Sequence, residues 1–456
     1  MKTFPSSTSW RGLRDLTARL GVDVPALWWS LLYFFCLLTG YYVLRPVRDA
    51  MGASGDVSAV FPPGLINWAA SHGWSLADYT LQILFSCTFV CMVLLQPAYG
   101  ALVSRFPRRV FLPVLYLGFI ACLGLFYWAF REQLAGRGAL FYIWVAVFNL
   151  FAVSVFWSYM ADVFSNADAK KVYGYIGAGG TIGALTGPGI TRLLVGHVGV
   201  ANLLLVSAGF LMVCLLCIVM LRGKAAAREQ AEGSTGADKA MGGSMWAGLR
   251  LVASDPLLRG LAILMFFGVG VGTLLYNEQA AIVRQHYPSP EQATRFYAMI
   301  DWAVNGLTIV VQLLITRWLL RGYGVAPLLL LPAIAILIGF SLLAASPLPM
   351  LVAVVQVVTR ASEFSLAKPA RETLYTQVDR QARYKAKAVI DTVVYRAGDL
   401  TFVWSHKFLA AFGSGAVFLT GVGVAAGMTC GAWMVIRAHR RLSAVPLAEA
   451  GSKAMA

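Results

Sequence analysis

Long apolar runs separated by short polar joints make up most of this sequence. Six runs precede and six follow a polar stretch at residues 222–245, which contains no aromatic residue. A membrane-spanning helix needs about 20 apolar residues, and most of the runs approach or exceed this length. The pattern predicts an all-α integral membrane protein with twelve transmembrane helices in two pseudo-symmetric six-helix bundles. The predicted spans cover residues 26–44, 79–99, 110–130, 139–161, 172–195, 200–221, 257–279, 296–320, 326–345, 348–367, 386–411 and 414–437.

The central polar stretch sets the predicted domain boundaries. These are a cytoplasmic amino-terminal segment (1–25), a first six-helix bundle (26–221), a cytoplasmic linker (222–256), a second bundle (257–437) and a cytoplasmic tail (438–456). Within the linker, residues 246–255 are expected to form a short surface helix. Residues 163–173 and 374–384 follow the fourth span of each half and align without gaps. Parallel six-helix repeats are typical of transporters with a substrate site at the repeat interface.

Composition excludes a water-soluble domain. Hydrophobic residues make up 59% and charged residues 13% of the chain, whereas soluble domains carry about 25% charged residues. The first run begins only near Ala26 and lacks a cleavage site, so a span is expected there and not a signal peptide. All seven cysteines fall in apolar runs, and Cys214 and Cys217 are expected to pack helices. The five histidines lack ligand spacing, so no metal or other cofactor is expected, and no constellation indicates an enzyme.

The net charge of +16 is explained by lysines and arginines that orient the protein in the membrane. With a cytoplasmic amino terminus, the inside joints hold 26 of the 37 lysines and arginines, and the outside joints hold eight. Because cytoplasmic loops are enriched in Lys and Arg, both termini are expected in the cytoplasm, with the protein in a bacterial inner membrane. This distribution argues against a nucleic-acid partner.

Ionisable residues inside the spans are candidates for a polar cavity, since each costs about 2.5–3.5 kcal/mol on insertion scales. Arg396 lies near the middle of span eleven, and Asp391 and Asp399 flank it. Arg360 and Glu363 in span ten are three residues apart, close enough to pair. A structural ion pair and a ligand contact both remain open for each of these residues. Further polar side chains in spans seven and eight are Asn277, Glu278, Asp301 and Asn305.

Arg45 and Arg48 share one face near the outer end of the first span. They are either an interfacial pair that extends toward water or holders of phosphate or carboxylate, for which the planar guanidinium is suited.

Glycines recur every fourth residue in two spans. Gly179, Gly183 and Gly187 lie in span five, and span twelve repeats the spacing at Gly423, Gly427 and Gly431. No strand precedes the first set and no Gly-Lys-Ser/Thr ends it, which argues against a phosphate-binding loop. Close helix packing is expected at both stripes.

Several stretches resemble one known family. Residues 41–49, residues 156–157 with 167–173, residues 287–290 and residues 368–391 are similar to landmarks of the nucleotide (ATP/ADP) translocases of plastids and obligate intracellular bacteria. Residues 100–109 resemble the glycine-and-arginine joint of the wider major facilitator superfamily. The sequence departs from the translocase pattern where Arg48 replaces a lysine and Asn149 stands in place of a fourth-span glutamate.

The resemblance implies a secondary transporter that works by alternating access and exchanges an anionic phosphorylated solute such as ATP and ADP. It also implies the substrate-binding residues. Negative charge is expected to be held by Arg45, Arg48, Arg360, Lys385, Lys387 and Arg396, and balanced or coupled by Glu278 and Asp391. The expected partners are the small anionic solute and the lipid bilayer, with the protein a monomer.

Two alternatives remain open. The first is a proton-coupled symporter or exporter of a non-nucleotide solute, with Glu363, Asp391 or Asp399 as the proton carrier. The second is a membrane scaffold that transports nothing, which the dense intramembrane charge disfavours because such charge is costly without use.

Overall fold

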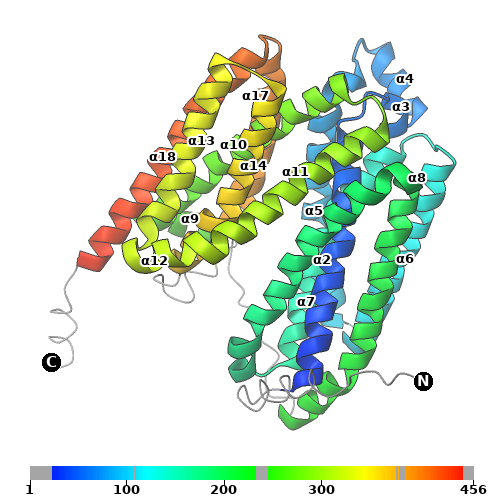
Figure 1. Ribbon diagram of the computed structural model, residues 1–456, viewed down its shortest axis with the longest axis vertical. Helices are drawn as coiled ribbons and strands as arrows, with labels where there is room; N and C mark the ends of the chain where they lie inside the picture. Colours follow the sequence, from blue (N-terminus) through cyan, green and yellow to red (C-terminus); the bar gives the residue numbers. More distant parts are fainter. Residues whose placement is uncertain are drawn as a thin grey trace, which may run out of the picture. The chain divides into compact units, whose positions relative to one another are not determined.

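The computed structural model is helical throughout the part of the chain that it describes, residues 23–105, 108–232, 245–375, 378, 386–387 and 389–444, and these residues contain no strand (Figure 1). The helices before residue 233 are α2 (Val24–Gly52), α3 (Val57–Val60), α4 (Pro63–Ser71), η1 (Leu76–Tyr79), α5 (Thr80–Arg105), α6 (Arg108–Arg131), α7 (Arg137–Val163) and α8 (Asn166–Glu232). Those after residue 244 are α9 (Met245–Ser254), α10 (Pro256–His286), α11 (Pro290–Val311), η2 (Gln312–Thr316), α12 (Arg317–Tyr323), α13 (Val325–Ala345), α14 (Pro349–Ser362), η3 (Glu363–Ala367), α15 (Lys368–Tyr375), η4 (Val389–Val394), α17 (Tyr395–Ala410) and α18 (Ser414–Ala444). The short helix predicted within the linker at residues 246–255 is present as α9.

Ten of the described helices are long and apolar enough to cross a membrane, which makes this chain an integral membrane protein. The predicted number of twelve spans differs from ten for two physical reasons. The 67-residue helix α8 runs through predicted spans five and six, but Gly199 breaks it with a φ of 77° and a ψ of 168°. Predicted span eleven corresponds to η4 and α17, where Asp391, Arg396 and Asp399 lower the hydropathy.

The helices group into two compact units. The first contains the described residues of Met1–Thr80, Cys87–Asp238 and Tyr287–Trp302, and the second those of Leu81–Ser86, Lys239–His286 and Ala303–Ala456. Helices α5 and α11 each contribute to both units, so the units do not coincide with the two sequence halves residue by residue. The division into domains around the linker stays a prediction.

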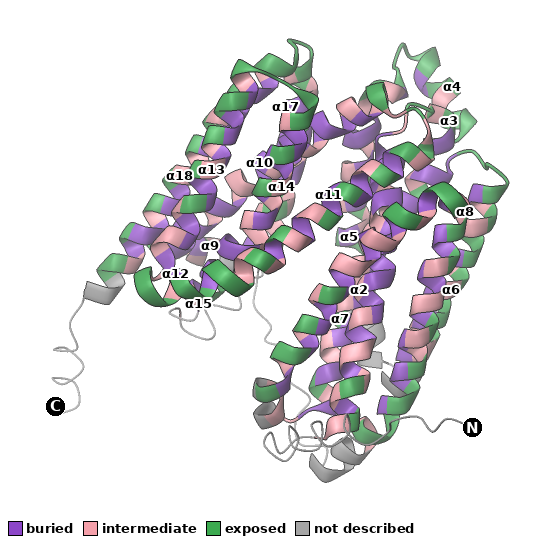
Figure 2. Cartoon of the chain, viewed as in Figure 1, coloured by how far each residue is buried: buried purple, intermediate pink, exposed green. Residues whose placement is uncertain are grey.

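In the first unit, α2 packs mainly against α8 and is largely buried (Figure 2). A Cβ atom on Gly183 would collide with the carbonyl oxygen of Phe35, and one on Gly187 would lie 2.8 Å from that of Thr39. Side chains at these positions would force α2 and α8 apart, as close glycine packing of membrane helices requires. The predicted packing role of the span-five stripe is confirmed.

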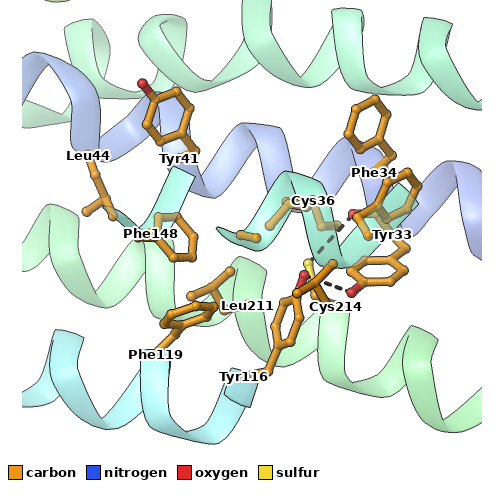
Figure 3. Close-up of a cluster of buried hydrophobic side chains, with 14 of the residues drawn as sticks. Tyr33, Phe34, Cys36, Tyr41, Leu44, Tyr116, Phe119, Phe148, Leu211 and Cys214 are labelled. Atoms are coloured by element: carbon orange, nitrogen blue, oxygen red, sulfur yellow. Dashed lines mark hydrogen bonds between the residues drawn. The ribbon is translucent and has the colours of Figure 1, made fainter. Parts of the chain in front are cut away.

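Figure 3 shows the core that this packing produces. The Tyr33 hydroxyl donates a hydrogen bond of 2.7 Å to the hydroxyl of Tyr116 in α6. The Cys214 thiol lies 3.6 Å from the carbonyl oxygen of Tyr33, which it can reach as a donor. Cys214 and Cys217 are buried, unbridged cysteines of this core, which confirms their predicted role in helix packing.

In the second unit, α10 packs against α18 and α17. A Cβ atom on Gly431 would approach the backbone nitrogen of Leu264 to 2.7 Å, and one on Gly427 would meet the Phe267 ring. Gly423 does not belong to this contact, because a Cβ there would meet nothing within 4 Å. Gly421 instead lies against the ring of Phe340 in α13. The predicted packing role of the glycine stripe in span twelve is therefore wrong at Gly423, because the helix presents this residue on an exposed face.

Candidate functional site

Two arginines and two aspartates form a cluster at the carboxyl-terminal part of α2 within the first unit. Arg48 donates two hydrogen bonds to one oxygen of Asp49, of 2.9 Å from Nε and 2.6 Å from Nη2. The Nε atom of Arg45 lies 3.8 Å from Asp49 and 3.6 Å from Asp301 in α11. The cluster is neutral in formal charge, which lets four ionised groups share a poorly hydrated site.

Local sequence explains three of the four members of this cluster. Residues three and four apart meet on one helix face, so Arg45, Arg48 and Asp49 are brought together by α2 alone. Asp301 arrives from the first part of α11, which belongs to the same unit. The sequence marked Asp301 as an ionisable residue within a span but did not assign it to Arg45, because spacing along the chain carries no information on that contact.

The two carboxylates of this cluster are more deeply buried than the two arginines. Asp49 and Asp301 keep 3% and 2% of their side-chain surface, whereas Arg45 keeps 17%. The buried Nε of Arg45 has no hydrogen-bond partner among the described residues. Its carboxylate neighbours balance its charge from beyond hydrogen-bond distance. The Nε–H group of Arg45 is therefore a buried donor without an acceptor among the described residues.

Tyrosine rings lie against both cations of this cluster. The guanidinium carbon of Arg45 lies 5.7 Å from the ring centre of Tyr42, and that of Arg48 lies 5.1 Å from the ring of Tyr142 in α7. Such cation–π contacts stabilise a desolvated arginine and orient its plane. The sequence indicated Arg45 and Arg48 but gave no signal for Tyr142.

A second polar cluster lies in the second unit, on α10 and α17. Arg396 pairs with Asp399, with Nη1 and Oδ2 3.2 Å apart, so the predicted ion pair is present. The Thr273 hydroxyl donates to the other oxygen of Asp399 at 3.2 Å. Asn277, one turn further along α10, donates to the carbonyl oxygen of Thr273 at 2.8 Å. Asp399 therefore has a partner for each oxygen, and Thr273 is a member that the sequence did not identify.

Glu278 forms a contact that the sequence missed. Its Oε1 lies 2.8 Å from Nε2 of His406 in α17, and both side chains are buried. A histidine and a carboxylate at this distance hold a proton between them in at least one protonation state. No spacing along the chain marks His406 as a partner of Glu278, because the two residues are 128 positions apart in sequence.

The remaining candidates are Arg360, Lys385, Lys387 and Asp391, together with Glu363 as a candidate proton carrier. Glu363 pairs with Arg371 at 2.7 Å across the π-helical segment η3, and Lys387 bonds both oxygens of Glu372, at 2.7 and 2.6 Å. Arg360 is half-buried in α14, and Asp391 is exposed on η4. Lys385, together with most of the predicted repeat at 374–384, lies outside the described residues.

Apolar helices that can cross a membrane, with buried ion pairs inside them, define a polytopic membrane transport protein. The chain belongs to the Major Facilitator Superfamily, whose family model matches residues 50–364.

Known relatives support a closer placement. ADP,ATP carrier protein 1 of Arabidopsis thaliana chloroplasts is 24% identical over 449 residues, covering 84% of this chain and 68% of the relative. The plastidic ATP/ADP-transporter of Solanum tuberosum is 23% identical over 443 residues, covering 84% and 67%. These similarities confirm the resemblance to the nucleotide translocases, of which this chain is a divergent relative.

Solved structures share the fold. The POT family transporter PepTSo matches with a TM-score of 0.60 at 11% identity, covering 92% of this chain and 99% of that one. The D-xylose-proton symporter matches with a TM-score of 0.57 at 15% identity, covering 90% and 96%. At these identities the likeness concerns the fold alone.

Proposed function

We propose that this protein exchanges ATP and ADP, or a closely related phosphorylated anion, by alternating access. In this proposal twelve spans form two six-helix halves, residues 26–221 and 257–437, with α8 supplying two spans and η4 with α17 supplying one. The protein is a monomer in a bacterial inner membrane with both termini in the cytoplasm.

The observation that carries the proposal is the buried Nε atom of the half-buried Arg45. Its Nε has no hydrogen-bond partner among the described residues, while Asp49 and Asp301 neutralise it from 3.8 and 3.6 Å. A phosphate oxygen offers the short, charge-assisted hydrogen bonds that these carboxylates do not form with Nε. The curated names of the relatives, ADP,ATP carrier and plastidic ATP/ADP-transporter, point to the same class of solute.

Competition between the substrate and the resident carboxylates gives this site a means of driving conformational change. A ligand shifts an equilibrium only through different affinity for the two states. When phosphate takes Arg45, the contact with Asp301 is released, and α2 and α11 lose one of their links. In the empty protein the contact between Arg45 and Asp301 forms again. This contact holds the carrier in its current conformation until a second nucleotide binds.

Other charged residues contribute in the same proposal. Arg48, Arg360, Lys385, Lys387 and Arg396 hold negative charge during passage, while Glu278 and Asp391 balance it. Arg396 would exchange Asp399 for the substrate in the way that Arg45 exchanges Asp301.

Reconstitution tests the function directly. Purified protein in liposomes preloaded with 1 mM ADP should take up labelled ATP at least tenfold faster than protein in empty liposomes. Labelled inorganic phosphate and AMP serve as competing solutes that report which part of the nucleotide is recognised. Equal uptake into loaded and empty liposomes, or no nucleotide uptake at all, would rule out nucleotide exchange.

The buried His406–Glu278 pair favours a second candidate, a proton-coupled symporter or exporter of a non-nucleotide solute. A carboxylate paired with histidine inside a membrane helix is a common type of proton relay. In that case an imposed pH gradient alone should drive solute accumulation in empty liposomes, with the inside alkaline for a symporter and the inside acidic for an exporter that exchanges solute for protons. Solute exchange at a rate that does not depend on the pH gradient would support the nucleotide antiporter instead.

A further inference from the structure

A cavity of about 390 Å³, open to the surface, lies in the second unit and shares no lining residue with the polar cluster on α10 and α17. It is formed where the turn between α12 and α13 meets the last turns of α18, three elements that Figure 1 shows side by side. Its lining residues are Tyr323, Gly324, Val325, Ala326, Ile436, His439 and Arg440. The volume falls in the range of small-molecule pockets, about 300–1,000 Å³.

The charged side chains of the three helices that form this cavity are all positive. Helices α12, α13 and α18 contain no aspartate or glutamate. They contain five arginines, which are Arg317, Arg321, Arg437, Arg440 and Arg441. These three helices supply no carboxylate of their own to the five arginines, so this end of the helices attracts anions.

Aromatic side chains place the cavity at the depth of lipid headgroups. Trp318, Tyr323 and Trp433 are exposed, and Trp318 and Tyr323 contact each other with ring centres 5.4 Å apart. Arg437 lies 5.1 Å from the ring centre of Trp433. Exposed Trp and Tyr beside arginine at the end of a membrane helix mark the membrane–water interface.

We infer that this cavity binds the phosphate-bearing headgroup of an anionic phospholipid. Ile436, His439 and Arg440 are three and four residues apart, so they present one face of α18 to the cavity. Arg440 and His439 supply donors for the phosphate. Ile436, Val325 and Ala326 offer apolar contact for the glycerol and the first methylenes of the acyl chains. Basic pockets between membrane helices are a recognised form of lipid-headgroup site.

Native mass spectrometry of the full-length protein tests this inference. Detergent-purified protein is titrated with phosphatidylglycerol or with phosphatidylcholine, and the retained lipid is counted. We expect phosphatidylglycerol adducts at least fivefold more abundant than phosphatidylcholine adducts. Arg440→Gln should weaken retention about fivefold, the effect of one arginine near an anionic membrane surface. Equal retention of the two lipids by the wild type would overturn the inference.

Two further variants separate a built pocket from diffuse surface charge. Arg441→Gln removes the neighbouring arginine, which does not line the cavity, and should change retention less than twofold. Ala326→Leu keeps every charge but narrows the cavity, and should reduce retention as Arg440→Gln does. Equal losses from Arg440→Gln and Arg441→Gln, or full retention by Ala326→Leu, would contradict a pocket-bound lipid. Displacement of phosphatidylglycerol by 10 mM inorganic phosphate would assign the cavity to a soluble anion instead.

Discussion

The Nε atom of Arg45 in α2 lies 3.6 Å from Oδ2 of Asp301 in α11. This contact joins the first predicted span to the eighth within one compact unit. The two side chains are separated by most of the chain in sequence and are both largely buried. Their pairing links helices from the two sequence halves within one compact unit.

Removing the charge of Asp301 tests how much the Arg45–Asp301 pair contributes to the stability of the protein. Asp301→Asn should lower the stability of the purified protein by about 3–5 kcal/mol, since breaking a buried pair leaves an uncompensated charge. Thermal unfolding followed by size-exclusion chromatography gives the measurement. Glu291→Gln, in the first turn of the same helix, is the matched control and should have little effect. Unchanged stability in Asp301→Asn would show that Asp49 alone neutralises Arg45.

Substitutions at Arg396 test whether its ion pair takes part in transport. Arg396→Lys keeps the charge but loses the planar fork, so normal membrane insertion with at least tenfold slower uptake is expected. Arg396→Ala should abolish uptake. Adding Asp399→Ala should restore insertion wherever it was lost, because no buried charge then lacks a partner. Full transport by the double alanine variant would make the pair purely structural.

The His406–Glu278 pair distinguishes exchange from proton coupling. For a nucleotide exchanger, Glu278→Gln and His406→Gln should leave the response to an imposed pH gradient at zero, as in the wild type. For a proton-coupled transporter, both should abolish gradient-driven accumulation while counterflow of solute persists. Measuring both assays on the same vesicles prevents a general loss of folding from being read as uncoupling.

The two glycine stripes offer a matched pair of positions. Gly183→Leu should reduce the yield of inserted protein strongly, because the side chain would meet the backbone of Phe35 in α2. Gly423→Leu should be tolerated, because a Cβ there meets nothing within 4 Å. Fluorescence-detected chromatography of tagged protein compares the yields. A poorly inserted Gly423→Leu together with a normal Gly183→Leu would contradict the described packing.

Reporter fusions test the proposed topology. The charge bias predicts a cytoplasmic signal from fusions near residue 233 and at the carboxyl terminus. Alkaline phosphatase should therefore be inactive at both positions and green fluorescent protein fluorescent. An active phosphatase at either position would overturn the arrangement with both termini inside.

Sequence alone determined the features that depend on local pattern. Apolar runs gave the membrane helices because span length is set by bilayer thickness, and spacing of three or four residues placed Arg45 beside Arg48 and Arg396 beside Asp399. The stripe at Gly183 followed from the same periodicity. At Gly423 that periodicity was insufficient, since it places a residue on a helix but does not say which face of that helix meets a neighbour.

Only the tertiary structure decided the contacts between distant segments. It paired Asp301 with Arg45, His406 with Glu278 and Thr273 with Asp399. It also formed the cavity between the α12–α13 turn and α18, whose residues share no motif. The physical reason is common to all of them. A buried charge is stable only beside a partner, which establishes that each intramembrane ion has a neighbour, but the packing of the helices selects which one.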